Sequence, residues 1–323
     1  MTTETVVVLD PITPATADRL RGLLPPGLVL THGSARDEAH LQSIIAEADY
    51  AISGQIGVSG AVLEAARRLK LLHKWGVGVD NLDLDAARRL GIKVARTTGS
   101  NAVPVAELTL GLMISTLRSL SHSAAELGQG RWVGGNFARP AFLLSGKTVG
   151  LVGFGAIGKT VARLLTGFGC TILYHKQTRI DAAEEAALGV RYADMAELLA
   201  TSDVVSLHCP LTPKTAGLID RAALASMKRT AILVNVARGG VVNEPDLVWA
   251  LENKIILAAA MDVFETEPLP ADSPLLGIDG LTVTPHIAGG SADTFDKTVL
   301  QMFGNIQRVA HGEPVPERDV VVG

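Results

Sequence analysis

A glycine-rich turn that joins a strand pattern to a helix pattern constrains this chain more than any other feature. A buried strand is expected over residues 148–153, and Gly153, Gly155 and Gly158 lead from it into a helix that begins near Ala156. In such a turn the glycines permit the tight bend, the approach of a pyrophosphate and close helix packing, while the helix N-terminus favours negative charge. The pattern predicts a dinucleotide-binding turn, although GxGxxG spacing alone also occurs in ordinary loops.

The length, charge and cysteine content of the chain limit its class. A chain of 323 residues that is 47% hydrophobic can bury a large core and predicts two domains. Its net charge of −4 provides no basic surface of the kind that binds nucleic acid, and the apolar run Val6–Leu9 is too short for a signal peptide or a membrane span. Cys170 and Cys209 cannot form a disulfide framework or a cysteine metal cluster. We expect a cytoplasmic α/β protein with no metal, nucleic-acid or membrane partner.

Short β-branched runs alternate with helical patterns through the first hundred residues. We expect strands at 6–9, 29–31, 50–53, 71–75 and 92–95, and helices near 16–24, 37–48, 60–68 and 84–90. Repeated βα units predict a parallel sheet. One long helix is expected over 103–127, with Asn101 as its N-cap and Pro104 in its first turn.

A second alternating series follows, with strands expected at 148–153, 171–175, 203–207, 231–235, 257–261 and 281–284. The helical pattern over 291–310 is expected to return to the first domain. The sequence therefore predicts an α/β fold with two doubly wound parallel-sheet domains. Residues 1–100 and 290–323 would form a discontinuous substrate-binding domain, residues 101–289 a dinucleotide-binding domain, and a cleft between them would hold ligands.

Polar residues gather after three of the expected strands in the second domain. Arg238 lies in the segment VNVARGG, Asp262 and Glu267 lie in MDVFETEP, and His286 lies in TPHIAGG. Because ligands of an open parallel sheet bind outside the carboxyl ends of its strands, these side chains could converge around a cofactor.

Together with the glycine turn and the segment GVGVDN at residues 76–81, these motifs resemble the D-isomer-specific 2-hydroxyacid dehydrogenases in order and spacing, over nearly the whole chain. The resemblance implies a flavodoxin-like substrate domain, a Rossmann-like dinucleotide domain and a homodimer, with the long helix contributing to the subunit interface.

The resemblance also implies roles for the polar residues. The nicotinamide carries the hydride, so the protein must position the substrate and supply a proton. Arg238 would bind the substrate carboxylate and carbonyl, because its planar fork suits that pair of oxygens. His286 would be the general acid, and Glu267 would orient its imidazole and favour the protonated form. The backbone N–H groups of Val77 and Gly78 would bind the carboxylate as well. Taken singly, these residues could be an ion-paired arginine, a loop histidine, a surface glutamate and a tight turn.

The dinucleotide is expected to contact a larger set of residues. Asp262 resembles the residue that hydrogen-bonds the carboxamide, and the segment after residue 207 resembles the loop over the adenine and pyrophosphate. The expected cofactor-binding residues are Gly153, Phe154, Gly155, Ala156, Ile157, Gly158, His175, Lys176, Thr178, Arg179, Cys209, Pro210, Thr215, Val236, Ala237, Arg238, Asp262, His286 and Gly289.

The end of the second strand in such a domain indicates which dinucleotide is used. An acid there usually accepts hydrogen bonds from the adenosine ribose and repels a 2′-phosphate. The segment LYHKQTR has no acid and instead offers Lys176, Thr178 and Arg179. This resembles the NADP-using glyoxylate and hydroxypyruvate reductases, so we expect NADP to be preferred and NAD to be possible.

Glyoxylate and hydroxypyruvate are therefore the expected substrates, and three alternatives stay open. In phosphoglycerate oxidation, Arg96 would be a candidate phosphate contact, although we expect no appended regulatory domain because the chain ends at Gly323. Formate or phosphite oxidation is disfavoured, because the loop around Val77 lacks the polar or lysine side chain of those relatives. A dinucleotide-sensing corepressor is the non-enzymatic alternative, and turnover of a simple 2-oxo acid would exclude it.

Overall fold

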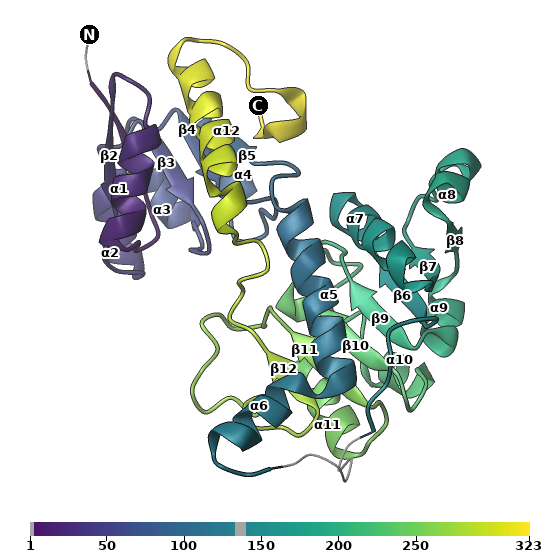
Figure 1. The fold of residues 1–323 in the computed structure, drawn as a ribbon. Coiled ribbons are helices and arrows are strands. Elements are labelled where there is room, and N and C mark those ends of the chain that lie inside the picture. The colour runs from purple at the N-terminus through teal and green to yellow at the C-terminus, as the bar shows by residue number, and fades with distance from the viewer. Residues whose placement is uncertain (1–2, 133–139) are drawn as a thin grey trace. The chain divides into compact units, whose positions relative to one another are not determined.

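The computed structural model describes residues 3–132 and 140–323, and the chain divides into two compact units. Unit 1 consists of Met1–Asn101 and Gly290–Gly323, and unit 2 consists of Ala102–Gly289. Figure 1 shows the long helix α12 (Ala292–Ala310) beside the N-terminal strands and helices of unit 1. Unit 1 is thus assembled from both ends of the sequence.

The sheet of unit 1 has the strand order β13-β5-β4-β3-β1-β2. All neighbouring strands are parallel except β13, which runs antiparallel to β5 at the edge. The strands are β1 (Glu4–Val8), β2 (Leu28–His32), β3 (Tyr50–Ser53), β4 (Leu71–Lys74), β5 (Lys93–Arg96) and β13 (Val320–Val322); the remaining elements are α1 (Pro14–Leu23), α2 (Glu38–Ile45), α3 (Gly60–Ala65), α4 (Leu84–Leu90) and the 3-10 helix η3 (Glu317–Asp319).

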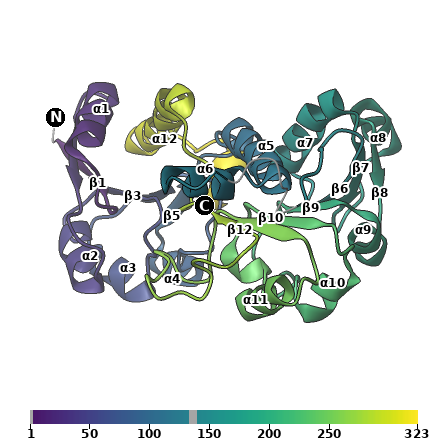
Figure 2. The ribbon, with the colours of Figure 1, turned by 60° about the horizontal axis from the view of Figure 1, so that its bottom comes forward.

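Helices cover both faces of this sheet, because successive side chains of a strand point to opposite sides. Val7 of β1 packs in the core with α2, α3 and α4, whereas Val6 and Val8 pack in the core with α1 and α12. Figure 2 shows these two helical layers on either side of the strands. Unit 1 is a doubly wound sheet.

The sheet of unit 2 is parallel throughout, with the order β12-β11-β10-β9-β6-β7-β8. Its strands are β6 (Thr148–Val152), β7 (Thr171–His175), β8 (Val190–Tyr192), β9 (Val204–Leu207), β10 (Ile232–Asn235), β11 (Ala258–Met261) and β12 (Leu281–Val283); its helices are α5 (Ala102–Arg118), α6 (Leu120–Gly128), α7 (Ala156–Leu165), α8 (Ala182–Leu188), α9 (Met195–Thr201), α10 (Arg221–Ser226) and α11 (Glu244–Glu252), with 3-10 turns η1 (Thr166–Phe168) and η2 (Gly239–Val241).

Unit 2 is also covered on both faces. Leu151 of β6 packs in the core with α5 and α7, and its neighbour Val152 packs in the core with α9, α10 and α11. The prediction of an α/β fold with two doubly wound parallel sheets is confirmed. The carboxyl ends of β6, β7, β9, β10, β11 and β12 lie along one edge of this sheet, where the residues predicted to contact a dinucleotide follow them.

Polar side chains begin many of the helices. An Asp, Asn, Ser or Thr before the helix accepts a hydrogen bond from a backbone N–H in its first turn, which satisfies a donor that the helix itself leaves open. This holds for α1 to α4 and for α8 to α12. Helix α7 instead has Gly155 as its N-cap residue, which offers no side-chain cap. Its first N–H groups are therefore left for another acceptor.

The prediction of one long helix over residues 103–127 is wrong. The helix is interrupted at Ser119, whose φ of 51° ends α5 and turns the chain into α6. The backbone N–H of Phe142 donates to the carbonyl of Leu117. In a continuous helix, that carbonyl would accept a hydrogen bond from the next helical turn. No single helix of the described residues is long and apolar enough to span a membrane; α5 and α6 reach that standard only together, across a bend of 67°. The short edge strands β8 and β13 were not predicted.

Candidate active site

The predicted glycine turn joins β6 to α7 in unit 2. Gly153 has a φ of 94°, and a Cβ there would overlap the backbone of His208 and Cys209. A Cβ on Gly158 would lie 2.6 Å from the carbonyl oxygen of Gly153, so only glycine lets α7 approach the turn. Nothing lies within 4 Å of the Cβ position of Gly155. The turn therefore has the open backbone and the uncapped helix N-terminus that suit a pyrophosphate.

The segment after β9 packs against this turn. The backbone N–H of His208 donates to Val152, and the hydroxyl of Thr215 donates to the carbonyl of Pro210 over 2.6 Å. Cys209 is buried, whereas Pro210 is exposed. Burial lowers the pKa of His208 to about 3, so this histidine is neutral near pH 7 and unsuited to proton transfer. Pro210 and Thr215 therefore form a loop surface beside the glycine turn.

The end of β7 carries the residues predicted to distinguish NADP from NAD. Arg179 forms a bidentate ion pair with Glu185 of α8, through contacts of 2.7 and 2.6 Å. Tyr174 donates its hydroxyl to the same carboxylate, and the pKa of Glu185 falls to about 2 because of the hydrogen bonds from Arg179 and Tyr174. This pairing was not predicted from the sequence. Lys176 and Thr178 thus lie beside an arginine whose charge is already matched.

Other predicted cofactor residues lie at the strand ends, and some of them have buried side chains. The side chain of Phe154 is buried and stacks on Tyr174 at 4.3 Å between ring centroids, so that only its backbone is available to a ligand. His175 has its Nδ1 3.1 Å from the carbonyl of Ala193, which holds the imidazole at the strand end. Val236 and Ala237 are buried directly after β10, whereas Gly289 follows the segment after β12.

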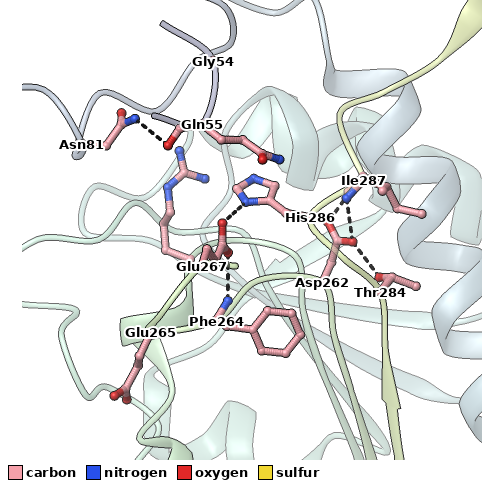
Figure 3. A network of polar contacts seen from close by, with 12 residues as sticks. Gly54, Gln55, Asn81, Asp262, Phe264, Glu265, Glu267, Thr284, His286 and Ile287 are labelled. Carbon is pink, nitrogen blue, oxygen red and sulfur yellow. Dashed lines mark hydrogen bonds and ion pairs between the residues drawn. The ribbon is translucent and has the colours of Figure 1, made fainter. Parts of the chain in front are cut away.

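Asp262 follows β11 and is fully buried. Its carboxylate accepts the hydroxyl of Thr284 over 2.6 Å and the backbone N–H groups of Ile287 and Ala288 over 3.0 and 2.9 Å (Figure 3). Asp262 therefore ties the end of β11 to the segment that carries His286. Its predicted contact with the carboxamide stays a prediction.

His286 and Glu267 form a close pair. The imidazole Nδ1 of His286 lies 2.6 Å from Glu267 Oε2 (Figure 3), and the backbone N–H of Phe264 donates to Glu267 Oε1 over 3.0 Å. Burial alone would raise the pKa of Glu267, but the hydrogen bonds from His286 and Phe264 and the nearby charge of Arg238 hold it below its ordinary value. The ionised carboxylate can only accept, so Nδ1 of His286 carries the proton of this bond.

His286 is also held through its backbone. Its φ of 52° is uncommon for a histidine, and its N–H donates to the carbonyl of Asp262 over 2.8 Å. The main chain and the imidazole are therefore fixed from two sides, by Asp262 and by Glu267. A general acid needs such fixed geometry.

Arg238 follows β10, the strand beside β11. Asn235 braces this segment: its side chain donates to the carbonyl of Arg238 over 2.9 Å and accepts from the N–H of Ala237 over 3.0 Å. The guanidinium donates to the carbonyl of Ala237 over 2.7 Å. The charge of Arg238 lowers the pKa of Glu267, so the structure brings Arg238, Glu267 and His286 together as the sequence predicts.

Two positioning residues were missed. Gly239 packs on the peptide that joins Phe264 to Glu265, with no room for a Cβ. Glu244, at the start of α11, accepts the N–H of Glu265 over 2.7 Å, and Glu265 accepts the N–H of Glu244 over 3.3 Å. The pair Gly239-Gly240 after a strand was the only sequence signal for this packing.

The predicted substrate loop of unit 1 follows β4. The hydroxyl of Thr97 accepts a hydrogen bond from the backbone N–H of Gly76 over 2.9 Å, and Arg96 donates to the carbonyl of Val77 over 3.4 Å. Among the residues that the structure describes, the backbone N–H groups of Val77 and Gly78 have no hydrogen-bond partner. The loop therefore offers two adjacent donors to an anion, as predicted for a carboxylate.

The far end of that loop is anchored through Asn81. Its side chain accepts from Lys74 over 2.8 Å and donates to the carbonyl of Ile56 over 2.7 Å. It also donates to the carbonyl of Gln55 over 3.3 Å (Figure 3). The described residues contain no group of three His, Cys, Asp or Glu side chains placed to hold a metal ion.

Comparison with known proteins places these features in one family. The model of the NAD-binding domain of D-isomer specific 2-hydroxyacid dehydrogenases matches residues 110–288. A hydroxypyruvate reductase of Thermotoga maritima is 36% identical over 274 residues, which cover 84% of this chain and 87% of that protein. The crystal structure of TT0316 protein from Thermus thermophilus is similar with a TM-score of 0.87 and 34% identity, over 98% of this chain and 100% of that one.

A D-3-phosphoglycerate dehydrogenase of Mycobacterium tuberculosis (strain ATCC 25618 / H37Rv) is 36% identical over 318 residues. The match covers 98% of this chain and 59% of that protein. The chain thus spans less than two thirds of the length of that relative.

Proposed function

Because the chain belongs to the D-isomer specific 2-hydroxyacid dehydrogenase family, we propose that it reduces small 2-oxo acids to D-2-hydroxy acids with a nicotinamide dinucleotide. The observation that carries this proposal is the pair of His286 and Glu267, with 2.6 Å between Nδ1 and Oε2, under the charge of Arg238. A carbonyl that accepts a hydride becomes an alkoxide, which needs a nearby proton donor and a nearby cation. These three residues supply both.

The residues at the edge of unit 2 fit the cofactor. The uncapped N-terminus of α7 and the bare backbone of Gly155 suit a pyrophosphate, and no side chain of the described residues lies within 4 Å of the Gly155 Cβ position. When bound, the nicotinamide supplies the hydride. Lys176 and Thr178, in a segment without an acid, support a preference for NADPH, with NADH as a possible second cofactor.

Arg238 binds the substrate carboxylate and polarises the carbonyl in this proposal, and the free N–H groups of Val77 and Gly78 bind the same carboxylate. His286 gives its Nε2 proton to the alkoxide oxygen, while Glu267 stabilises the imidazolium beforehand and keeps its plane fixed. In the oxidative direction the neutral imidazole takes the proton back. Asp262 holds the His286 segment throughout, because its carboxylate binds the two N–H groups that follow.

Glyoxylate and hydroxypyruvate are the substrates that the sequence resemblance favours. The hydroxypyruvate reductase of Thermotoga maritima, which this chain matches over most of both sequences, supports this choice. Oxidation of phosphoglycerate is the second candidate, supported by the similarity to the phosphoglycerate dehydrogenase of Mycobacterium tuberculosis.

We also propose a homodimer. Leu120 and Leu127 of α6 are 51% and 56% exposed, and apolar side chains that exposed on one helix favour contact with another chain. Light scattering during size-exclusion chromatography tests this: the mass of a single chain across the micromolar range would exclude it.

The function is tested by following the nicotinamide absorbance with NADPH and then NADH. Glyoxylate, hydroxypyruvate, pyruvate and phosphohydroxypyruvate are offered in turn, with His286→Asn as the inactive control. Fast oxidation of NADPH by the first two, lost in the control, supports the whole proposal. Faster turnover with NADH would contradict the cofactor preference alone, whereas no turnover with any acid would contradict the proposed reaction.

A further inference from the structure

Arg96 is unusual among the arginines of this chain. It is the last residue of β5, at the carboxyl end of the unit 1 sheet. Of the described arginines, Arg96 and Arg238 are the two whose side chains are not exposed, and all the others lie on the surface. A partly buried guanidinium costs free energy unless an anion or several acceptors surround it.

Few hydrogen bonds offset the partial burial of the Arg96 guanidinium. Its one hydrogen bond runs from Nη1 to the carbonyl of Val77, at 3.4 Å, and its Nε is buried without a partner. No carboxylate of the described residues pairs with it. A guanidinium has five N–H donors, so most of its capacity is unused. Buried donors that no protein atom satisfies call for a ligand or an ordered water.

Two buried acids of unit 1, Asp10 and Asp319, accept hydrogen bonds from groups other than Arg96. Asp10 accepts the backbone N–H groups of Gln55 and Ile56 over 2.8 and 3.0 Å. Asp319 accepts the N–H of Thr98 over 3.1 Å and also binds the side chains of two residues of α12. Lys74 lies beside Arg96 in the register of β4 and β5, which adds a second cation at the same edge. The edge therefore favours an anion.

Arg96 also lies beside the loop proposed to bind the substrate. Val77, whose carbonyl it contacts, and Gly78 carry the two free N–H groups assigned to the substrate carboxylate. These two N–H groups are assigned to one carboxylate, and Arg96 adds a charged fork beside them. A second anionic group on the same substrate would match that charge, which a single carboxylate bound by the two N–H groups leaves unmatched.

We propose that Arg96 is a specificity-determining residue that binds a second anionic group of the substrate. The preferred substrates are then 2-oxo acids that carry a carboxylate or a phosphate on the carbon next to the keto group. This inference rests on the proposed function, and it ranks acids with two anionic groups above glyoxylate and hydroxypyruvate.

The test is the ratio of kcat/KM for acids with two anionic groups and for acids with one, measured with the full chain at saturating NADPH. Oxaloacetate and phosphohydroxypyruvate carry two anionic groups, and hydroxypyruvate and pyruvate carry one. We expect the ratio to exceed 1 in the unaltered protein and to fall by about 10- to 100-fold in Arg96→Gln, which is the usual effect of losing a charge-assisted hydrogen bond. Arg96→Lys should keep part of the ratio, because it keeps the charge but loses the fork.

Arg36→Gln is the matched control, because Arg36 is an exposed arginine of unit 1, and its ratio should not change. Melting temperatures of all variants show whether they fold, and the Lys variant serves if the Gln variant does not. An oxaloacetate ratio that falls more than the phosphohydroxypyruvate ratio identifies a carboxylate as the second group, and the reverse identifies a phosphate.

A ratio that Arg96→Gln leaves unchanged, with equal losses for all four acids, would overturn the inference and leave Arg96 as a support of the Val77 loop. Turnover of the monoanionic acids alone would also overturn it while the proposed function stands. No turnover of any acid would overturn both.

Discussion

The backbone of Gly239 lies directly against the carbonyl group of Phe264, with no space for a Cβ between them. This contact joins the segment that carries Arg238 to the segment that carries Glu267. The N–H of Phe264 donates to Glu267 at the same place. Two of the proposed catalytic side chains are therefore fixed relative to each other by a backbone contact between neighbouring strand ends.

We predict that Gly239→Ala abolishes activity and destabilises unit 2. The added methyl meets backbone, which cannot rotate away, so a loss of about 3 kcal/mol in unfolding free energy is expected. Thermal unfolding and kcat with NADPH measure the effect. Gly240→Ala is the control, because its Cβ would meet only the flexible side chain of Leu211, at 3.5 Å. Equal behaviour of the two variants would contradict the assignment.

Glu244 is predicted to position Glu267 indirectly. Glu244→Ala removes the acceptor for the N–H of Glu265, and we expect a loss of about 1–2 kcal/mol in stability and a lower kcat. Glu244→Gln should restore kcat, since its side-chain oxygen can accept the same bond. The KM for NADPH should change little in either variant. Glu252→Ala, at the exposed end of the same helix, serves as the control, and a loss of kcat there would argue against a local effect.

Much of the fold could be predicted because most of the strands are short, buried and rich in aliphatic residues. The strand pattern at β6 and the glycines after it are enough to define the dinucleotide turn. The break at Ser119 could not be predicted, because it depends on the N–H of Phe142, which reaches the Leu117 carbonyl from a distant part of the sequence. Strand β13 is three residues long and pairs with β5, more than two hundred residues earlier.

The sequence predicted the site residues that follow strands, but it did not predict the backbone contacts that hold them in place. Arg238, Glu267 and His286 come after neighbouring strands, so topology alone brings them to one edge. The packing of Gly239 on Phe264 leaves no periodic signal in the sequence. The pairing of Arg179 with Glu185 was missed because the acid lies in the next helix, outside the strand end where acids are sought.

Lys176→Asp is predicted to shift preference from NADPH toward NADH. The substitution removes a cation near the expected 2′-phosphate and adds an anion that repels it, and a change of about 10- to 100-fold in the ratio of kcat/KM values is expected. Arg179 is left in place, because its removal would strip Glu185 of its ion pair and confuse specificity with stability. Lys297→Asp, at an exposed lysine of α12 in unit 1, is the control. An unaltered ratio in Lys176→Asp would remove the support for NADPH.

Glu267→Gln should lower kcat for reduction by about 10²- to 10⁴-fold. Glutamine keeps an acceptor for the imidazole but removes the negative charge beside it. The KM for NADPH should stay near its original value. A KM for NADPH that rises along with the loss of kcat would mean that Glu267 supports the loop and does not act on His286.

His73 is predicted to make the stability of unit 1 depend on pH. It is fully buried, with its Nδ1 3.0 Å from the Lys74 carbonyl and its Nε2 3.1 Å from the Asn305 amide nitrogen. Burial lowers the pKa of His73 to about 4, although the Lys74 carbonyl and the charge of Asp319 oppose this. Below about pH 6.5, His73 binds a proton in the unfolded chain but not in the folded one. The free energy of unfolding is therefore highest above that pH and falls by on the order of 3 kcal/mol between pH 6.5 and 4. His73→Gln should lose less stability over this interval than the unaltered protein, as followed by melting temperature, and the exposed His311→Gln should lose as much. Parallel curves for the His73 variant and the unaltered protein would show that His73 is protonated in the folded state.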